Sequence, residues 1–330
     1  MGGTVAGLLL DRGHEPVIFD NFCHAPREML PAGVPLIEGD LADRRGLESI
    51  FAVARSAGRP YDGVMHFAAL IEAGESMKKP EIYFRNNTAA TLSLLEAMHA
   101  QQVGKLVFSS TAAVYGEPEA VPIPEDARLA PTNAYGESKL LVEHILRWFH
   151  QIHGLRYASL RYFNVAGAPE TSQGIVRGEA HEPESHLIPI ILDVALGRRE
   201  SISIYGDDYP TPDGTCIRDY VHVSDLAEAH MLAFAALDRP HDLHQPDLGG
   251  RLIYNLGNGQ GFSVREVIES ARRVTGQSIP TQLHPRRAGD PAVLVASSDK
   301  AIRELGWKPR YAQLDEILRT AWTWHQKRYA

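Results

Sequence analysis

Short apolar runs alternate with amphipathic segments along the first half of the chain. The apolar runs predict buried strands at residues 16–19, 63–67, 106–109 and 157–161. Between them, residues 44–57 and 82–100 repeat apolar positions every three or four residues, as helices do. This alternation is typical of a parallel sheet covered by helices. The predicted fold class is α/β, with a Rossmann-type doubly wound parallel sheet and a smaller C-terminal α+β lobe.

Polar residues follow several of the predicted strands. Asp20 and Asn21 come after the first run, and Thr111 comes after the third. Ligands of open α/β sheets bind beyond the carboxyl ends of the strands. The sequence therefore places a binding site at this edge.

Tyr135 and Lys139 stand four residues apart and so share one face of a predicted helix. An ammonium near a phenol favours the phenolate and lowers the pKa of the Tyr. With the Thr111 hydroxyl, these groups could move a proton off an alcohol, so Tyr135 is a candidate general base. The same spacing also occurs in ordinary surface pairs of helices, so the interpretation depends on its context.

Asp20 closes a predicted strand about 20 residues after a glycine-rich start, where a dinucleotide-binding fold places a carboxylate for the adenine ribose hydroxyls. This position favours NAD over NADP. The alternative is a residue that only ends the strand and caps a turn.

The chain resembles the UDP-galactose 4-epimerases of the extended short-chain dehydrogenase/reductase family from Gly2 almost to its C-terminus. The segments that carry this resemblance are 17–21, 39–41, 66–69, 108–116, 135–139, 161–167, 186–189, 206–215, 217–223 and 285–290. The resemblance implies interconversion of UDP-galactose and UDP-glucose. Tyr135 would take the proton of the sugar 4-hydroxyl while NAD accepts a hydride from carbon 4. Thr111 would bridge sugar and phenol, and Lys139 would hold the nicotinamide ribose.

The resemblance also implies two sets of binding residues. Those expected to contact NAD are Gly2, Asp20, Asn21, Asp40, Leu41, Phe67, Ala68, Asn86, Tyr135, Lys139 and Phe163. Those expected to contact the UDP-sugar are Thr111, Asn164, His186, Leu187, Ser203, Tyr205, Arg218, Arg287, Asp290 and Leu294. The planar guanidinium suits a diphosphate, although Arg218 could instead pair with Asp219 and Asn164 could serve a turn. The NAD domain is expected at 1–165 and the nucleotide-sugar lobe at 166–330, with some segments returning to the first domain.

Leu294 occupies a position where the family has a large Tyr in members confined to unacetylated sugars. A Leu leaves more room, which favours acceptance of UDP-N-acetylhexosamines unless neighbouring side chains refill the space.

The chain opens with Met1-Gly2-Gly3, and Gly2 aligns with the last glycine of the family's Gly-x-x-Gly-x-x-Gly turn. By this comparison about ten residues, including a central strand, are absent before Met1, and weaker NAD binding is expected. The alternative is a shortened variant that still folds.

Net charge, pI and cysteine content limit the possible partners and the compartment of the protein. A net charge of -8 and a pI near 6.0 provide no basic field for nucleic acid or anionic lipid, and no membrane partner is expected. Two cysteines suit a reducing cytoplasm. His241 and His244 lack a third ligand at motif spacing, so no metal is expected. The resemblance implies a homodimer formed through helices at 82–100 and 135–153.

Three other functions can be compared with the residues present. A 4,6-dehydratase would carry Asp-Glu after the strand-end Thr, where Ala112 and Ala113 stand. Another UDP-sugar epimerase, such as one acting on UDP-glucuronate, stays open. A non-catalytic nucleotide-sugar-binding protein would have no need of Thr111, Tyr135 and Lys139.

Overall fold

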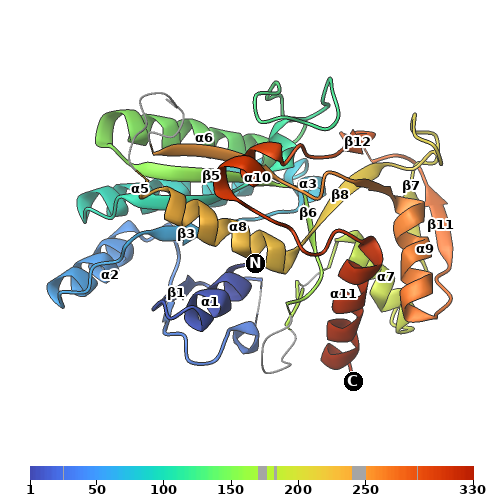
Figure 1. Cartoon of the computed structure of the whole chain (residues 1–330), viewed down its shortest axis with the longest axis horizontal. Helices are drawn as coiled ribbons and strands as arrows, with labels where there is room; N and C mark the ends of the chain where they lie inside the picture. The colour runs from blue at the N-terminus through green and yellow to red at the C-terminus, as the bar shows by residue number, and fades with distance from the viewer. Residues whose placement is uncertain (25, 170–176, 182–183, 240–249, 288) are drawn as a thin grey trace.

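The computed structural model describes residues 1–24, 26–169, 177–181, 184–239, 250–287 and 289–330. At its centre is a parallel sheet with the strand order β3-β4-β5-β9. Its strands are β3 (Val64–His66), β4 (Lys105–Thr111), β5 (Arg156–Tyr162) and β9 (Arg251–Leu256). β9 comes from the second half of the chain and pairs with β5, so a late segment returns to the first domain (Figure 1).

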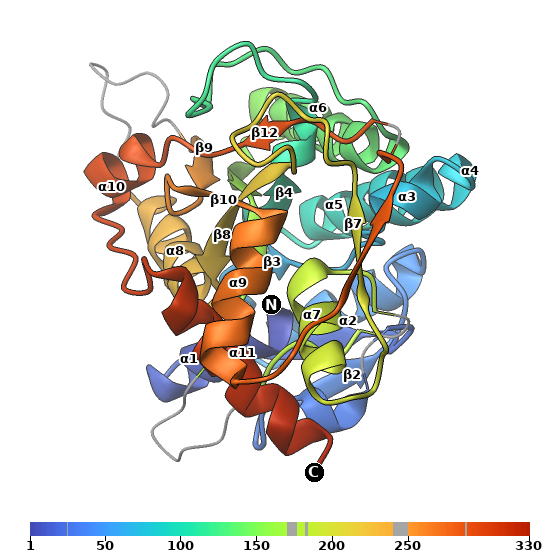
Figure 2. The same ribbon diagram turned by 90° about the vertical axis from the view of Figure 1, so that its right-hand side faces the viewer.

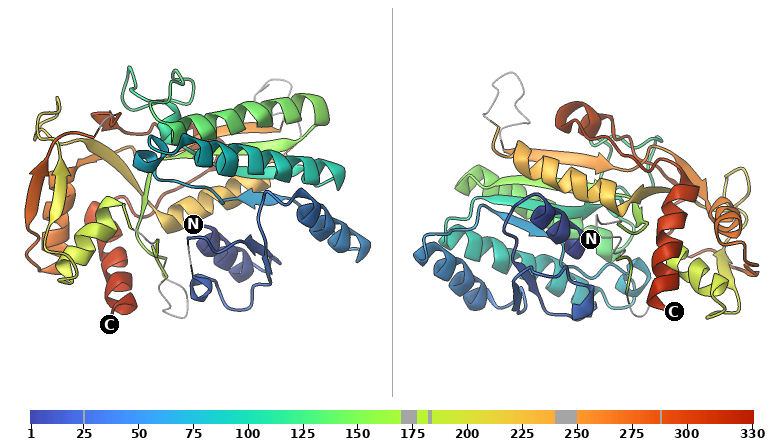
Figure 3. Two further views of the ribbon diagram at one scale, coloured as in Figure 1. Left: turned by 180° about the vertical axis from the view of Figure 1, so that it is seen from behind. Right: turned by 60° about the horizontal axis from the view of Figure 1, so that its bottom comes forward.

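A second parallel pair consists of β1 (Ile18–Asp20) and β2 (Leu36–Glu38). Among the described strands, none pairs with both this pair and β3. Figure 3 shows β1 and α1 (Gly2–Asp11) on the side of the sheet opposite α5 and α6. The predicted α/β class with parallel strands is confirmed. The strands β1 to β5 fall into two sheets, and further parallel pairs occur in the second lobe.

Side chains alternate between the two faces of the central sheet, as strand geometry requires. Leu106 and Phe108 pack beneath helices on one face, whereas Val107 belongs to the core on the other. The first face carries α2 (Arg44–Ser56), α5 (Ala90–Ala100) and α6 (Ala134–His153). The second carries α8 (Val223–Ala236), against which α1 packs, and α10 (Asp299–Leu305).

The segment predicted as one helix at 82–100 has three parts. It consists of α4 (Pro80–Tyr83), the π-helical η2 (Phe84–Ala89) and α5. The buried Asn87 lies in the π-helical part and bonds the backbone of Leu70, accepting from its N–H at 2.8 Å and donating to its carbonyl at 2.9 Å. The chain is helical from Pro80 to Ala100, as predicted for 82–100, with a π-helical turn in its middle.

The second lobe is built around two further sheets (Figure 2). Its strands are β6 (Asn164–Ala166), β7 (Ile202–Tyr205), β8 (Ile217–His222), β10 (Gly261–Ser263), β11 (Thr281–His284) and β12 (Val293–Leu294). β8 pairs with β6, β10 and β12, and β7 pairs with β11. The core of this lobe lies among α7 (Leu187–Ala195), α9 (Val264–Thr275) and α11 (Leu314–Arg328).

Short helical segments complete the described chain. They are η1 (Arg27–Met29), α3 (Ala73–Ser76) and η3 (Ala112–Val114). Within the described ranges, no helix combines the length and the apolar character that crossing a bilayer requires.

Candidate active site

A continuous cleft of about 2830 Å³ lies between the central sheet and the second lobe. Pockets for one small ligand usually measure about 300–1,000 Å³, so this cleft has room for more than one. The predicted site residues that line it are Gly2, Asp20, Leu41, Phe67, Ala68, Thr111, Tyr135, Lys139, Phe163, Asn164, His186, Leu187, Ser203, Tyr205, Arg218, Arg287, Asp290 and Leu294. Asn21, Asp40 and Asn86 are the predicted residues outside its lining.

The start of α6 and the end of β4 bring Thr111, Tyr135 and Lys139 together. Asn133 caps α6 by accepting from the Gly136 N–H at 2.8 Å, which fixes where the helix begins. The Tyr135 N–H donates to the Ser76 hydroxyl at 3.1 Å, which links α6 to α3. Thr111 is the last residue of β4 and hydrogen-bonds the Tyr135 phenol.

Burial sets the acid-base behaviour of this trio. It raises the pKa of Tyr135, the bond with Thr111 lowers it in part, and the nearby carboxylate of Glu72 raises it further. The predicted lowering of the Tyr135 pKa by Lys139 is therefore wrong for this structure. The Lys139 ammonium instead donates to the Ser109 carbonyl at 2.9 Å, and burial lowers the pKa of Lys139 to about 7.

The expected adenine end of the cleft lies beyond β1 and β2. Asp20 accepts from the Phe22 N–H at 2.7 Å and so does cap the turn, as the alternative proposed. It also lines the cleft. The Asn21 side chain donates to Asp40 at 2.9 Å, which holds the two loops together. Asn86, in η2, donates to Asn87 at 3.0 Å.

The start of α1 fits a dinucleotide phosphate. α1 has 10 residues, and the Val5 N–H to Met1 carbonyl bond, at 3.1 Å, is its first, so the amides of Gly2 to Thr4 have no intrahelical acceptor. A Cβ added at Gly2 would lie 3.5 Å from the Phe67 ring, so this end abuts the β3 side of the cleft. Helix amides, the Asp20 carboxylate and the Lys139 ammonium together suit phosphates and ribose hydroxyls.

A second cationic corner lies across the cleft. Arg218 on β8 pairs with Asp290 and donates to the Pro291 carbonyl at 2.8 Å. Arg218 thus does form an ion pair with a nearby carboxylate, as the alternative proposed, but with Asp290 and not with Asp219. Asp219 is buried. It accepts from the amides of Asn258, Gly259 and Ala296 at 2.7, 3.0 and 3.1 Å. Burial raises the pKa of Asp219 to about 6, while the three amides oppose that rise.

Arg287 lies beside the aromatic wall of this corner. Its guanidinium carbon is 4.0 Å from the centre of the Tyr205 ring, and a hydrogen bond from Arg287 lowers the pKa of that phenol. Tyr205 and Ser203 both belong to β7. A planar cation and a ring form a surface on which a nucleotide base and its phosphates can lie.

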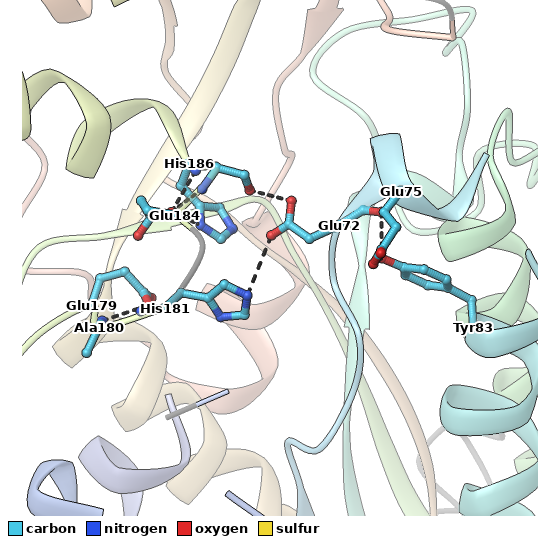
Figure 4. Close-up of polar contacts among 9 residues, drawn as sticks. Glu72, Glu75, Tyr83, Glu179, Ala180, His181, Glu184 and His186 are labelled. Atoms are coloured by element: carbon cyan, nitrogen blue, oxygen red, sulfur yellow. Dashed lines mark hydrogen bonds and ion pairs between the residues drawn. The ribbon is translucent and has the colours of Figure 1, made fainter. Parts of the chain in front are cut away.

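Residues at the start of α7 connect the second lobe to the central domain (Figure 4). Ser185 donates to the Glu72 carboxylate, and the His181 imidazole lies 3.8 Å from it. Burial disfavours the charged form of His186, but the hydrogen bond with Glu184 and the surrounding carboxylates outweigh it and raise the pKa of His186 to about 9. Leu187 begins α7, and the exposed Asn164 begins β6.

Sequence reasoning missed three residues that shape the site. Asn87 donates to the Ser138 hydroxyl at 3.0 Å and so ties the loop after β3 to α6. Glu72 faces the catalytic phenol and the second lobe. Ser138 precedes Lys139 directly and could have been noticed, whereas Asn87 and Glu72 matter through contacts distant in sequence.

Two predictions concern residues that the structure describes only in part or not at all. The polar, glycine-containing sequence of 171–184 predicts a flap near the substrate, but this segment is described only in part, and His241 and His244 lie outside the described residues. Over the described ranges, no group of three or more His, Cys, Asp or Glu side chains could hold a metal ion.

Comparisons with known proteins identify the family. The model of the NAD dependent epimerase/dehydratase family matches residues 1–257. A UDP-glucose 4-epimerase of Streptomyces lividans is 52% identical over 98% of this chain and 93% of its own length. That of Lacticaseibacillus casei is 47% identical over 99% and 94%. A solved UDP-glucose 4-epimerase from Brucella ovis in complex with NAD is 42% identical with a TM-score of 0.87, over 98% of this chain and 94% of its own. The chain therefore belongs to the NAD-dependent epimerase/dehydratase family.

Proposed function

We propose that this protein is an isomerase that interconverts UDP-galactose and UDP-glucose with bound NAD. The observation that carries the proposal is the convergence of Tyr135, Thr111 and Lys139 at the carboxyl end of β4, inside the cleft. Support comes from relatives named UDP-glucose 4-epimerase and from solved relatives with NAD, or with NAD⁺ and UDP. The uronic-acid and non-catalytic alternatives have no comparable support.

Tyr135 serves as the general base for the sugar 4-hydroxyl, and Thr111 orients that hydroxyl through its bond with the phenol. When bound, NAD would supply the hydride acceptor and donor for carbon 4, so that the hydrogen there can return on the opposite face of the sugar. Re-reduction takes the proton back from Tyr135, so neither proton nor hydride is consumed. Lys139 holds the nicotinamide ribose.

The remaining predicted residues divide between two ligands. NAD lies from Asp20, Asn21, Asp40 and Leu41 at the adenine end to Phe67, Ala68, Asn86 and Phe163 nearer the reacting sugar, with Gly2 at its pyrophosphate. The UDP-sugar lies against Arg218, Arg287 and Asp290 at its phosphates and against Asn164, His186, Leu187, Ser203 and Tyr205 along its length. One continuous cleft that is lined by residues of both sets supports this division.

The sugar pocket also accepts UDP-N-acetylhexosamines. Leu294 lines the cleft and packs against the cluster that contains Tyr115 and Phe163. A Leu at this position leaves space for an acetamido group. A 37% identical solved relative is a UDP-Glc/GlcNAc 4-epimerase from Campylobacter jejuni, with a TM-score of 0.80 over 99% of this chain and 96% of its own.

We propose a functional boundary near residue 165, with NAD on the 1–165 side and the nucleotide sugar on the 166–330 side.

A homodimer would form through α5 and α6, where Leu92, Trp148 and Ile152 are 37%, 55% and 67% exposed. Exposed apolar side chains on neighbouring helices support such an interface. The exposed free thiol of Cys23 supports a reducing cytoplasm.

Conversion of UDP-galactose to UDP-glucose by the purified chain, with and without added NAD, tests the proposed function. Production of UDP-glucose is expected, and activity that depends on added NAD would mean that the cofactor is bound weakly. No conversion under either condition would contradict the proposal.

A further inference from the structure

A buried ion pair lies one helical turn beyond the catalytic residues of α6. Glu143 on α6 pairs with Arg161 on β5, and their side chains are 6% and 3% exposed. Arg161 Nε donates to Glu143 Oε1 at 3.0 Å, and Nη2 donates to Oε2 at 2.6 Å. Two parallel bonds between planar groups fix orientation as well as distance.

The same carboxylate reaches the strand that carries Thr111. The Ser110 hydroxyl donates to Glu143 Oε1 at 2.5 Å. Ser110 stands between Thr111 and Ser109, whose carbonyl accepts the Lys139 ammonium. One carboxylate therefore joins α6, β4 and β5 beside the proposed acid-base residues.

The other side of the guanidinium is satisfied as well. Arg161 Nη1 donates to the Tyr115 oxygen and to the Glu125 carbonyl, both at 3.0 Å. Tyr115 in turn donates to Asn255 on β9 at 2.7 Å. Removing two charges from water costs free energy that apolar side chains of similar volume would avoid. Stability alone is therefore a poor explanation for this network.

We propose that the Glu143–Arg161 pair positions α6 so that Tyr135 and Lys139 meet Thr111. Tyr135, Lys139 and Glu143 are spaced by four residues and lie on one helix face, so anchoring the third limits rotation and sliding of the first two. Neither Glu143 nor Arg161 lines the cleft, so both act as positioning residues. The inference rests on the proposed catalytic roles of the trio.

The double variant Glu143→Leu/Arg161→Met tests the inference, because an apolar pair can preserve stability while removing the directional bonds. We expect kcat to fall by roughly 10- to 100-fold, the loss that a small misplacement of reacting groups causes. KM for UDP-galactose should change little, since Arg218 and Arg287 are untouched. The low-pH limb of kcat should move to higher pH, because a displaced Tyr135 loses the contact with Thr111 that lowers its pKa.

Lys105→Met is the matched control. Lys105 begins β4, at the end of the strand opposite Thr111, and pairs with Asp238 at 2.8 Å. Its loss removes a Lys–carboxylate pair from the same strand without touching α6. We expect the thermal midpoint to fall while kcat and its pH profile stay at wild-type values.

A folded double variant with wild-type kcat and an unshifted pH profile would overturn the inference. If the double variant does not fold, Ser110→Ala replaces it. That variant should lower kcat by about 3- to 10-fold, the size of the net contribution of one ordinary hydrogen bond, and unchanged kcat would equally overturn the inference.

Amide exchange separates failure of the inference from failure of the proposed function. Broken anchoring should speed exchange of the amides at the start of α6 in the double variant, or in Ser110→Ala if that replaces it, but not in Lys105→Met. This result does not depend on turnover. Inactive wild-type enzyme with this exchange pattern would contradict the proposed function alone, whereas unchanged exchange would contradict the positioning role.

Discussion

The catalytic corner and the phosphate corner of the cleft treat a buried cation in opposite ways. Lys139 donates to a backbone carbonyl, and burial lowers its pKa to about 7. Arg218 pairs with Asp290, and although burial opposes its charge, that carboxylate raises its pKa. One cation can lose its proton near neutral pH, whereas the other keeps its charge.

This difference matches the proposed tasks of the two corners. In the proposed mechanism Tyr135 moves the proton, and Lys139 can hold a ribose through its N–H groups whether or not it carries a charge. A group that binds phosphate should stay charged and present its hydrogen bonds in a fixed plane. The partner of each cation, rather than burial alone, assigns it to one task or the other.

Replacing Tyr135, the proposed base, should cause the largest loss of turnover. Tyr135→Phe deletes the phenol oxygen and keeps the ring, so kcat for UDP-galactose should fall by about 10²- to 10⁴-fold. Steady-state assays measure the loss. Tyr162→Phe is the control, because this phenol lies on neighbouring β5, is partly buried like that of Tyr135 and interacts with Ser109. It should keep most of the turnover. Equal losses in the two variants would mean that Tyr135 has no special role.

Replacing Arg218, the cation that keeps its charge, should weaken binding of the substrate. Arg218→Met should raise KM for UDP-galactose by about 10- to 100-fold, since hydrogen bonds to charged groups contribute about 1.5–3 kcal/mol each. The effect on kcat should be smaller. Arg273→Met, which removes an exposed pair with Asp315 in the same lobe, should leave both constants unchanged. A variant of Arg218 that lost only kcat would contradict the assigned role.

A smaller change should separate two substrates. Leu294→Tyr fills the space proposed for the acetamido group and should lower turnover of UDP-N-acetylglucosamine by about 10-fold or more. Turnover of UDP-galactose should persist. Leu294→Met nearly conserves volume and should keep both activities. Absence of N-acetyl turnover in the wild-type protein would show that neighbouring side chains fill the pocket.

The lowered pKa of Lys139 should make the free energy of unfolding depend on pH. A folded pKa of about 7, below the ordinary value of 10.5, means that the unfolded chain binds more protons between these pH values. The Lys139 contribution to the free energy of unfolding therefore rises with pH across that window. Urea unfolding at several pH values should show this rise in the wild type relative to Lys139→Met. A difference between the two proteins that is independent of pH would contradict the lowered pKa.

Local patterns predicted most of the catalytic architecture. The apolar run at 106–109 marks β4, and the spacing of Tyr135 and Lys139 places both on one face of α6. Because parallel strands end at one edge, Thr111 was expected near the phenol. The structure agrees because these features depend on neighbouring residues.

Local sequence patterns could not predict the pKa of Lys139 or the carboxylate with which Arg218 pairs. The pKa of Lys139 depends on the burial that tertiary packing imposes. Asp290, the partner of Arg218, lies 72 residues away from it. The π-helical turn η2 and the hydrogen bonds between Asn87 and Leu70 could not be predicted from helical periodicity either.

Isotope tracing tests the central claim most directly. UDP-galactose labelled with deuterium at carbon 4 should give UDP-glucose that keeps the label at carbon 4, because NAD returns the same hydride that it removed. Tyr135→Phe should give almost no product. Conversion with loss of deuterium to the solvent would contradict hydride transfer through bound NAD, and absence of conversion by the wild-type chain supplied with NAD would contradict the epimerase assignment.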